Sequence, residues 1–173
     1  MSQPAIHRLL TTAGIHIAAS TISRIITDDT SIFHEEKADI FAAGLQSTGY
    51  QHIDDTGARV NGKNHYTHVL CNPFYTAYFT CPKKDRLTLL GILSGGELSF
   101  HLNQEAVQLM IKLKLSKTQR SRIEPLIQSQ PMSRAEIDKQ LDILFPNPKK
   151  HRTQRRIILE ASALVAYQNR DDA

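Results

Sequence analysis

The spacing of apolar residues predicts a helical N-terminal region. Apolar positions recur at helical spacing from Ile6 to Leu10, and Gly14 then interrupts the pattern. Residues 20–26 continue as a second short helix, whose isoleucines share one face: Ile22, Ile25 and Ile26. Two short helices around a glycine turn are typical of a helix-turn-helix. On the second helix Ser20, Thr21 and Arg24 could face DNA phosphates or base edges, whereas the alternative is a plain helical hairpin.

A third helix is expected over residues 33–47, with a polar break at residues 28–31 suited to capping its first turn. Its apolar positions, Ile40, Phe41 and Leu45, would be buried. These residues complete a helical segment that we place at 1–49.

From residue 50 the pattern changes to strands. Residues 50–55, 65–71 and 74–81 are rich in β-branched and aromatic residues and are separated by turn signals. The first link contains Asn61-Gly62, the strongest short hairpin signal, because a type I′ turn needs positive φ at both positions. We expect a three-stranded antiparallel meander within a segment at 50–96.

After Pro82 the remaining elements read as helices, over 83–93, 104–113, 119–127, the segment after Ser133, and 152–167. Ser116 suits an N-cap, and Ser133 with Glu136 forms a capping box. The predicted fold class is α+β, with a basic helical segment at 97–173.

Composition narrows the class of protein. The chain has 173 residues, of which 40% are apolar and 22% charged, as in an ordinary globular domain. No apolar run reaches the roughly 18 residues of a membrane span, and the first ten residues are too polar for a signal peptide. The 2 cysteines exclude a disulfide scaffold. We therefore expect a cytoplasmic protein that does not associate with membranes.

The net charge of +4 is concentrated in one stretch. Residues 111–156 carry 12 Lys and Arg against 4 Asp and Glu, or +8, whereas residues 1–110 carry 8 against 10, or −2. Five of these cations surround the start of the final predicted helix: Lys149, Lys150, Arg152, Arg155 and Arg156. Cations are unfavourable at a helix N-terminus unless an anion offsets them, and a phosphate backbone would do so. The pattern favours DNA binding here, the alternative being a solvated surface.

A pair of carboxylates, Asp54 and Asp55, lies near the end of the first predicted strand. Acidic residues are poor strand formers and are costly to bury. One explanation is that a carboxylate caps the turn to Gly57. The other is a divalent-metal site, because Mg²⁺ takes one or two carboxylates from a rigid element. His65, His68 and Cys71 also look like metal ligands, but residues three apart on a strand point to opposite faces.

The run from Tyr50 through Asp54-Asp55-Thr56-Gly57 to Gly62-Lys63, followed by the segment from His65 to Val69, resembles the first catalytic block of DDE-type bacterial insertion-sequence transposases. Residues 13–26 are similar to the region that precedes the catalytic domain there, and residues 97–156 to an insert that some of these enzymes carry. The resemblance implies an RNase H-like sheet, with Asp54 as the first catalytic, metal-binding Asp and Asp55 as its variable acidic neighbour. It also implies Mg²⁺-dependent, two-metal phosphoryl transfer in DNA transposition.

The chain departs from that family at its end. The family has a second Asp on a fourth strand and a later helical carboxylate, whereas Asp171 and Asp172 lie in no apolar β run. We therefore expect a truncated transposase, inactive alone, with weak or absent Mg²⁺ binding and an uncovered first strand that favours homo-oligomers. The alternative is a small, non-enzymatic DNA-binding or interaction protein with a helix-turn-helix.

Overall fold

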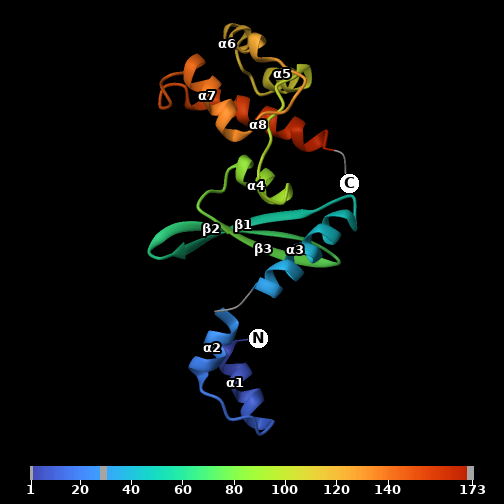
Figure 1. Ribbon diagram of the computed structural model, residues 1–173, viewed down its shortest axis with the longest axis vertical. Coiled ribbons are helices and arrows are strands. Elements are labelled where there is room, and N and C mark those ends of the chain that lie inside the picture. The colour runs from blue at the N-terminus through green and yellow to red at the C-terminus, as the bar shows by residue number, and fades with distance from the viewer. Residues whose placement is uncertain (1, 28–30, 171–173) are drawn as a thin grey trace. The chain divides into compact units, whose positions relative to one another are not determined.

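The computed structural model describes residues 2–27 and 31–170; the predicted cap at 28–30 and Asp171 and Asp172 lie outside them. The chain is α+β and divides into two compact units. One contains the residues up to Ile53 together with Val69–Ala77, and the other contains Asp54–His68 and the chain from Tyr78 onwards. Figure 1 shows the elements. No helix in the described ranges has the length and apolarity to span a membrane.

The N-terminal helices are α1 (Gln3–Thr12) and α2 (Ala19–Thr27), which pack against each other across a six-residue link. Of the three isoleucines on the apolar face of α2, only Ile22 is buried, whereas Ile25 is 60% exposed. Six residues are more than the usual three to four of a helix-turn-helix. The link is therefore longer than in a typical helix-turn-helix, and the prediction of a helix-turn-helix stays a prediction.

The third helix, α3 (Ser31–Gln46), contacts the end of the sheet through a glycine. A Cβ at Gly44 would lie within 2.7 Å of three atoms of the Tyr75 ring, so only glycine permits this approach. Next to it the Asn72 amide donates hydrogen bonds to the Gly44 carbonyl and to Ser47 Oγ, both at 2.9 Å. Phe41 is buried as predicted, but Ile40 is 52% exposed, since it lies on the helix face turned away from this contact.

Three strands, β1 (His52–Val60), β2 (Lys63–Asn72) and β3 (Tyr75–Cys81), form one sheet in the order β1-β2-β3. The predicted meander is confirmed, and Asn61 and Gly62 have φ of 49° and 75°, as a type I′ turn requires. The predicted end of the first strand is wrong: β1 does not end at Asp55 but continues to Val60, because the hairpin to β2 satisfies its backbone. Among the described strands β1 lies at the edge of the sheet and is exposed, so its carboxylates stay in water.

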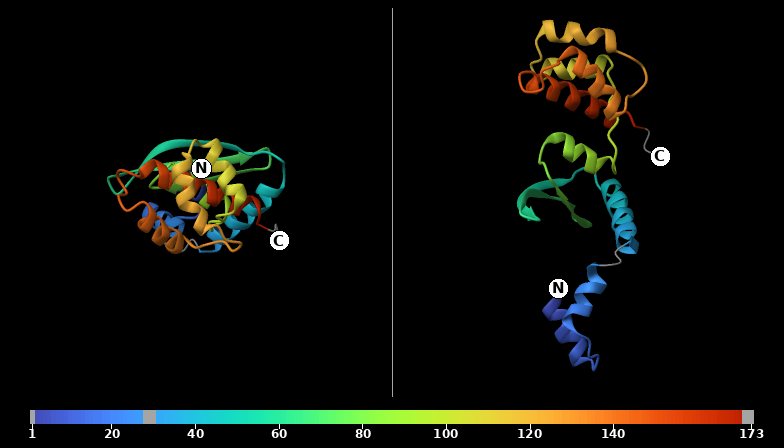
Figure 2. Two further views of the ribbon diagram at one scale, coloured as in Figure 1. Left: turned by 90° about the horizontal axis from the view of Figure 1, so that it is seen from above. Right: turned by 60° about the vertical axis from the view of Figure 1, so that its left-hand side comes forward.

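The second unit holds the main apolar core, which the later helices enclose. They are α4 (Arg86–Leu93), α5 (Gln104–Lys112), α6 (Lys117–Ile123), α7 (Arg134–Leu144) and α8 (Arg152–Gln168). α8 packs against α4 and α5 and buries most of its middle turns (Figure 2). The capping boxes at Ser116 and Ser133 are present. α6 stops earlier than predicted, at Ile123, because Pro125 starts a 3₁₀ turn over Glu124–Leu126.

Candidate functional site

Asp54 lies on an exposed face of the sheet. The two-residue turn pairs Val60 with Lys63, which places Thr56 opposite Thr67. Thr67 in turn shares a 3.0 Å hydroxyl hydrogen bond with Thr80 on β3. Because alternate strand residues share a face, these threonines mark the face that carries Asp54, which we call the Asp54 face. Asp54, Thr56 and Thr80 are all exposed.

Asp55 points to the opposite face and has a different role. Its carboxylate accepts a hydrogen bond from Lys84 Nζ at 3.3 Å, and this ammonium also lies 5.3 Å from the centre of the Tyr66 ring. The Asp54 carboxylate instead accepts a hydrogen bond from the Asp55 N–H at 2.8 Å. The structure therefore does not bring the two predicted carboxylates together as ligands of one ion.

The described side chains do not fit the two metal ions that the transposase resemblance implies. Two-metal phosphoryl transfer needs carboxylates that converge on both ions. Within residues 2–27 and 31–170 no group of three or more Asp, Glu, His or Cys is placed to hold a metal. We therefore derive no chemical step through a metal.

The zinc-like residues are also separated. His65 Nδ1 lies 3.3 Å from the Lys63 carbonyl, whereas His68 is buried on the other face with Nε2 3.1 Å from the Lys83 carbonyl. The cysteines Cys71 and Cys81 are both free. Burial raises the pKa of the Cys81 thiol, which disfavours the thiolate that a metal or an electrophile would need.

The five cations predicted to bind DNA near the start of α8 fall into two groups. Arg155 has a side chain only 14% exposed, and it donates to Asp142 Oδ1 at 2.6 Å and to the Phe145 carbonyl at 3.3 Å. A second carboxylate, Asp138, lies 3.7 Å away. Arg155 therefore connects α7 to α8 and has little surface left for a ligand. Arg156 is 60% exposed and lies 3.8 Å from Glu160, so it is only loosely paired.

Lys149, Lys150 and Arg152 form the second group, which we call the α8 basic cluster. All three are exposed, and in the described part of the chain no ion pair joins them to a carboxylate. His151 precedes the helix without a side-chain cap, and the first turn of α8 holds no acidic residue. The cluster therefore presents positive side chains beside N–H groups that lack partners within the helix, which suits a phosphate.

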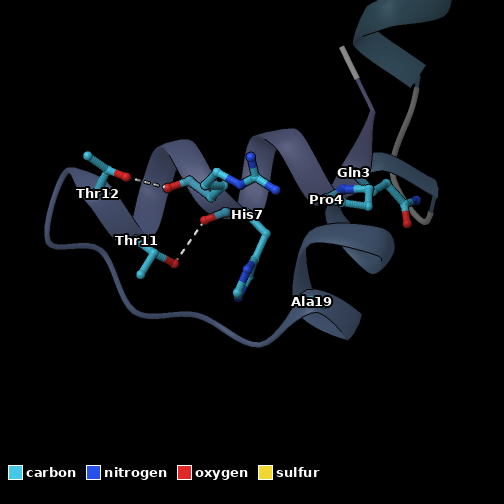
Figure 3. A pocket seen from close by; sticks show the side chains of 7 residues that line it. Gln3, Pro4, His7, Thr11, Thr12 and Ala19 are labelled. Atoms are coloured by element: carbon cyan, nitrogen blue, oxygen red, sulfur yellow. Dashed lines mark hydrogen bonds between the residues drawn. The ribbon is translucent and has the colours of Figure 1, made fainter.

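The predicted contacts on α2 are partly accessible. Ser20 and Arg24 are exposed one turn apart, so they share a helix face, whereas Thr21 is half-buried. Sequence reasoning missed a shallow hollow of about 560 Å³ that α1 lines with His7 and Arg8 (Figure 3). The threonine hydroxyls at its rim donate to carbonyls of their own helix, Thr11 to His7 and Thr12 to Arg8. The polar groups that the hollow offers a ligand are therefore mainly one imidazole, one guanidinium and the amide of Gln3.

Compared with models of protein families, with curated proteins and with solved structures, the chain gives no match.

Proposed function

We propose that this protein binds DNA through the α8 basic cluster, as a relative of the DDE-type transposases in which the Asp54 face lies next to the bound phosphate backbone. The observation that carries the proposal is the contrast within one short segment. Arg155 is held by carboxylates of α7, whereas Lys149, Lys150 and Arg152 are exposed beside the N-terminus of α8. Cations at that end of a helix are unfavourable unless an anion offsets them.

The wider charge distribution supports a long polyanion as the ligand. Lys112, Lys114, Lys117 and Arg122 are also exposed in the stretch that carries +8. Phosphates spaced along a backbone can reach several such side chains at once, and each contact releases counterions and adds affinity. These contacts read phosphates rather than base edges, so we expect weak sequence selectivity.

The first test compares matched double variants in a DNA-binding titration. Replacing Lys149 and Lys150 with Gln should weaken binding to duplex DNA about tenfold at physiological salt, because two phosphate contacts are lost. The control replaces Lys63 and Lys83, two exposed lysines outside the helical stretch, and should change the affinity about twofold or less. Equal losses in both variants would show that only net charge matters and would contradict the proposed interface.

The second test asks whether DNA approaches the Asp54 face. A carboxylate near a phosphate repels it by about 1 kcal/mol in water, so Asp54→Asn should tighten binding about fivefold in the presence of a chelator. Asp55→Asn is the control, since Asp55 lies on the other face and is paired with Lys84. An Asp54→Asn protein with wild-type affinity would remove the transposase-like part of the proposal and leave the basic cluster as a simple DNA-binding site.

The second candidate is a non-enzymatic DNA-binding protein that reads DNA with α2. It is favoured by the exposed, one-turn spacing of Ser20 and Arg24. The same titration separates the candidates. Arg24→Gln should remove most of the affinity and any sequence preference if α2 enters a groove, and should act only weakly if the α8 basic cluster carries binding.

A further inference from the structure

β1 presents an unpaired backbone edge. Within the described residues β2 pairs with one side of β1, and no strand pairs with the other. In a two-residue hairpin the residues that flank the turn, Val60 and Lys63, form a hydrogen-bonded pair, and such pairs then alternate along the strand. The even-numbered residues of β1 therefore bond to β2. Gly57 and Arg59 direct their N–H and C=O groups outward, as does Asp55 with its C=O, whereas the Asp55 N–H donates to the Asp54 carboxylate at 2.8 Å. An exposed edge of this length is a template for pairing with another strand.

The outward residues are self-complementary in charge. If a second β1 runs antiparallel to the first and the two glycines at position 57 lie opposite each other, the residues at positions 55 and 59 also face each other. Asp55 of each copy then lies opposite Arg59 of the other, on the same face of the joined sheet. The register uses the outward N–H and C=O groups of Gly57 and Arg59 and the C=O of Asp55, so the charge match and the hydrogen-bond match coincide. The Asp55 N–H would exchange its bond to the exposed Asp54 carboxylate for one to the partner strand.

Gly57 supports the same arrangement. Glycine in a strand interior costs about 0.5–1 kcal/mol relative to alanine. Among the described residues neither space nor backbone conformation requires it: a Cβ at Gly57 would meet no atom within 4 Å, and its φ lies outside the left-handed region. Glycine inside a strand often marks a bulge, a tight bend, or a place where a ligand or another backbone approaches closely, and the last of these fits a pairing of two edges. In the antiparallel register Gly57 lies on the two-fold axis, where the two chains meet.

We infer that two copies of this chain form a dimer by antiparallel pairing of their β1 strands, centred on Gly57, with Asp55 of each copy opposite Arg59 of the other. The pairing joins two three-stranded sheets into one continuous sheet and covers both exposed edges. It leaves Asp54 on the opposite face from the paired charges. The paired charges therefore do not involve the Asp54 face, and the inference does not rest on DNA binding.

Charge reversal and its rescue test the dimer by sedimentation equilibrium of the full chain. Asp55→Arg and Arg59→Asp each turn two attractive pairs into repulsive ones and should raise the dimer Kd about tenfold or more. The double variant is self-complementary again and should return close to the wild-type Kd. Lys63→Asp changes charge as Arg59→Asp does but lies on β2, and it should leave dimerisation unchanged. Lys84→Gln frees Asp55 from its ion pair within the chain and should lower the dimer Kd. A monomeric wild type, or a double variant no better than the single ones, would overturn the inference.

Amide hydrogen exchange locates the interface directly. In the wild-type dimer the amides of Gly57 and Arg59, which the monomer leaves outward, should gain protection as protein concentration rises. In Arg59→Asp they should exchange freely, whereas the amides of Thr56 and Ala58, bonded to β2, stay protected in both proteins and report that the hairpin is folded. A dimer in which the outward amides remain unprotected would place the interface elsewhere and refute the pairing.

Discussion

Arg155 belongs to the basic stretch, but contacts with neighbouring residues leave its side chain largely buried and therefore little available to a ligand. Its guanidinium lies between Asp138, Asp142 and the Phe145 carbonyl, and its side chain is 14% exposed. An ion pair is stronger where its charged groups are largely removed from water. Removing one partner then leaves the charge of the other uncompensated. Lys149 and Lys150, a few residues earlier, have no comparable partner among the described residues.

Arg155→Gln should therefore destabilise the protein by about 1–2 kcal/mol, a value reduced from that of a fully buried pair because Asp142 is 65% exposed. Arg156→Gln removes the same charge from a side chain that is 60% exposed and should cost less than about 0.5 kcal/mol. Chemical denaturation of the two variants measures the difference. Equal free energies of unfolding would mean that Arg155 does not hold α7 to α8.

At the scale of elements, the contact of α3 with β3 depends on a missing side chain. Gly44 lies against the Tyr75 ring, Phe41 contacts the same ring edge-on, and the Tyr75 hydroxyl donates to Gln51 Oε1 at 2.8 Å. The Asn72 amide ties the end of β2 to the same helix turn. A single methyl group at Gly44 would push the helix away from all of these partners.

Gly44→Ala should consequently destabilise the protein by about 1–3 kcal/mol through overpacking, although alanine is the better helix former. Gly49→Ala is the matched control: a Cβ there meets nothing within 4 Å, so the free energy of unfolding should change by less than about 0.5 kcal/mol. Thermal melts of both variants give the comparison. A Gly44→Ala protein as stable as wild type would refute the close approach.

Local signals predicted the elements well because their physics is local. Asn61-Gly62 needs only positive φ, and the Ser133–Glu136 capping box needs only its own four residues, where the hydrogen bonds from Ser133 lower the pKa of Glu136. Whether β1 lies at the edge or in the middle of the sheet depends on which other strands pair with it. The residues of β1 alone do not determine that pairing. An edge position lets Asp54 and Asp55 remain exposed in mid-strand, where sequence reasoning expected a strand end.

The candidate site was predictable only in part, for a related reason. Counting charges identifies the basic stretch, but separating Arg155 from Lys149 requires knowing that α7 places Asp138 and Asp142 beside the start of α8. Strand alternation does follow from sequence, so the opposite faces of Asp54 and Asp55 could have been anticipated once one strand was assigned to both. The ion pair of Asp55 with Lys84 could not, because 29 residues separate them.

At the scale of the whole molecule, the two proposed interactions use different surfaces: DNA binding uses the basic helical segment, and dimerisation uses the edge of β1. The helical segment concentrates positive charge at exposed side chains, and the edge of β1 carries a self-complementary pair of opposite charges. High salt should weaken DNA binding far more than dimerisation. DNA binding releases many counterions, whereas the backbone hydrogen bonds between two β1 strands release few. A dimer would also double the number of basic clusters offered to one DNA molecule.

The salt dependence of DNA binding tests the central claim most directly. Each phosphate contact contributes about 0.9 to the slope of log affinity against log salt. The variant with Gln at positions 149, 150 and 152 should therefore show a slope shallower than that of wild type by between about 2 and 3 units. The Arg155→Gln protein, measured where it is fully folded, should keep the wild-type slope. Parallel lines for the triple variant and wild type would contradict the assignment of DNA binding to the α8 basic cluster.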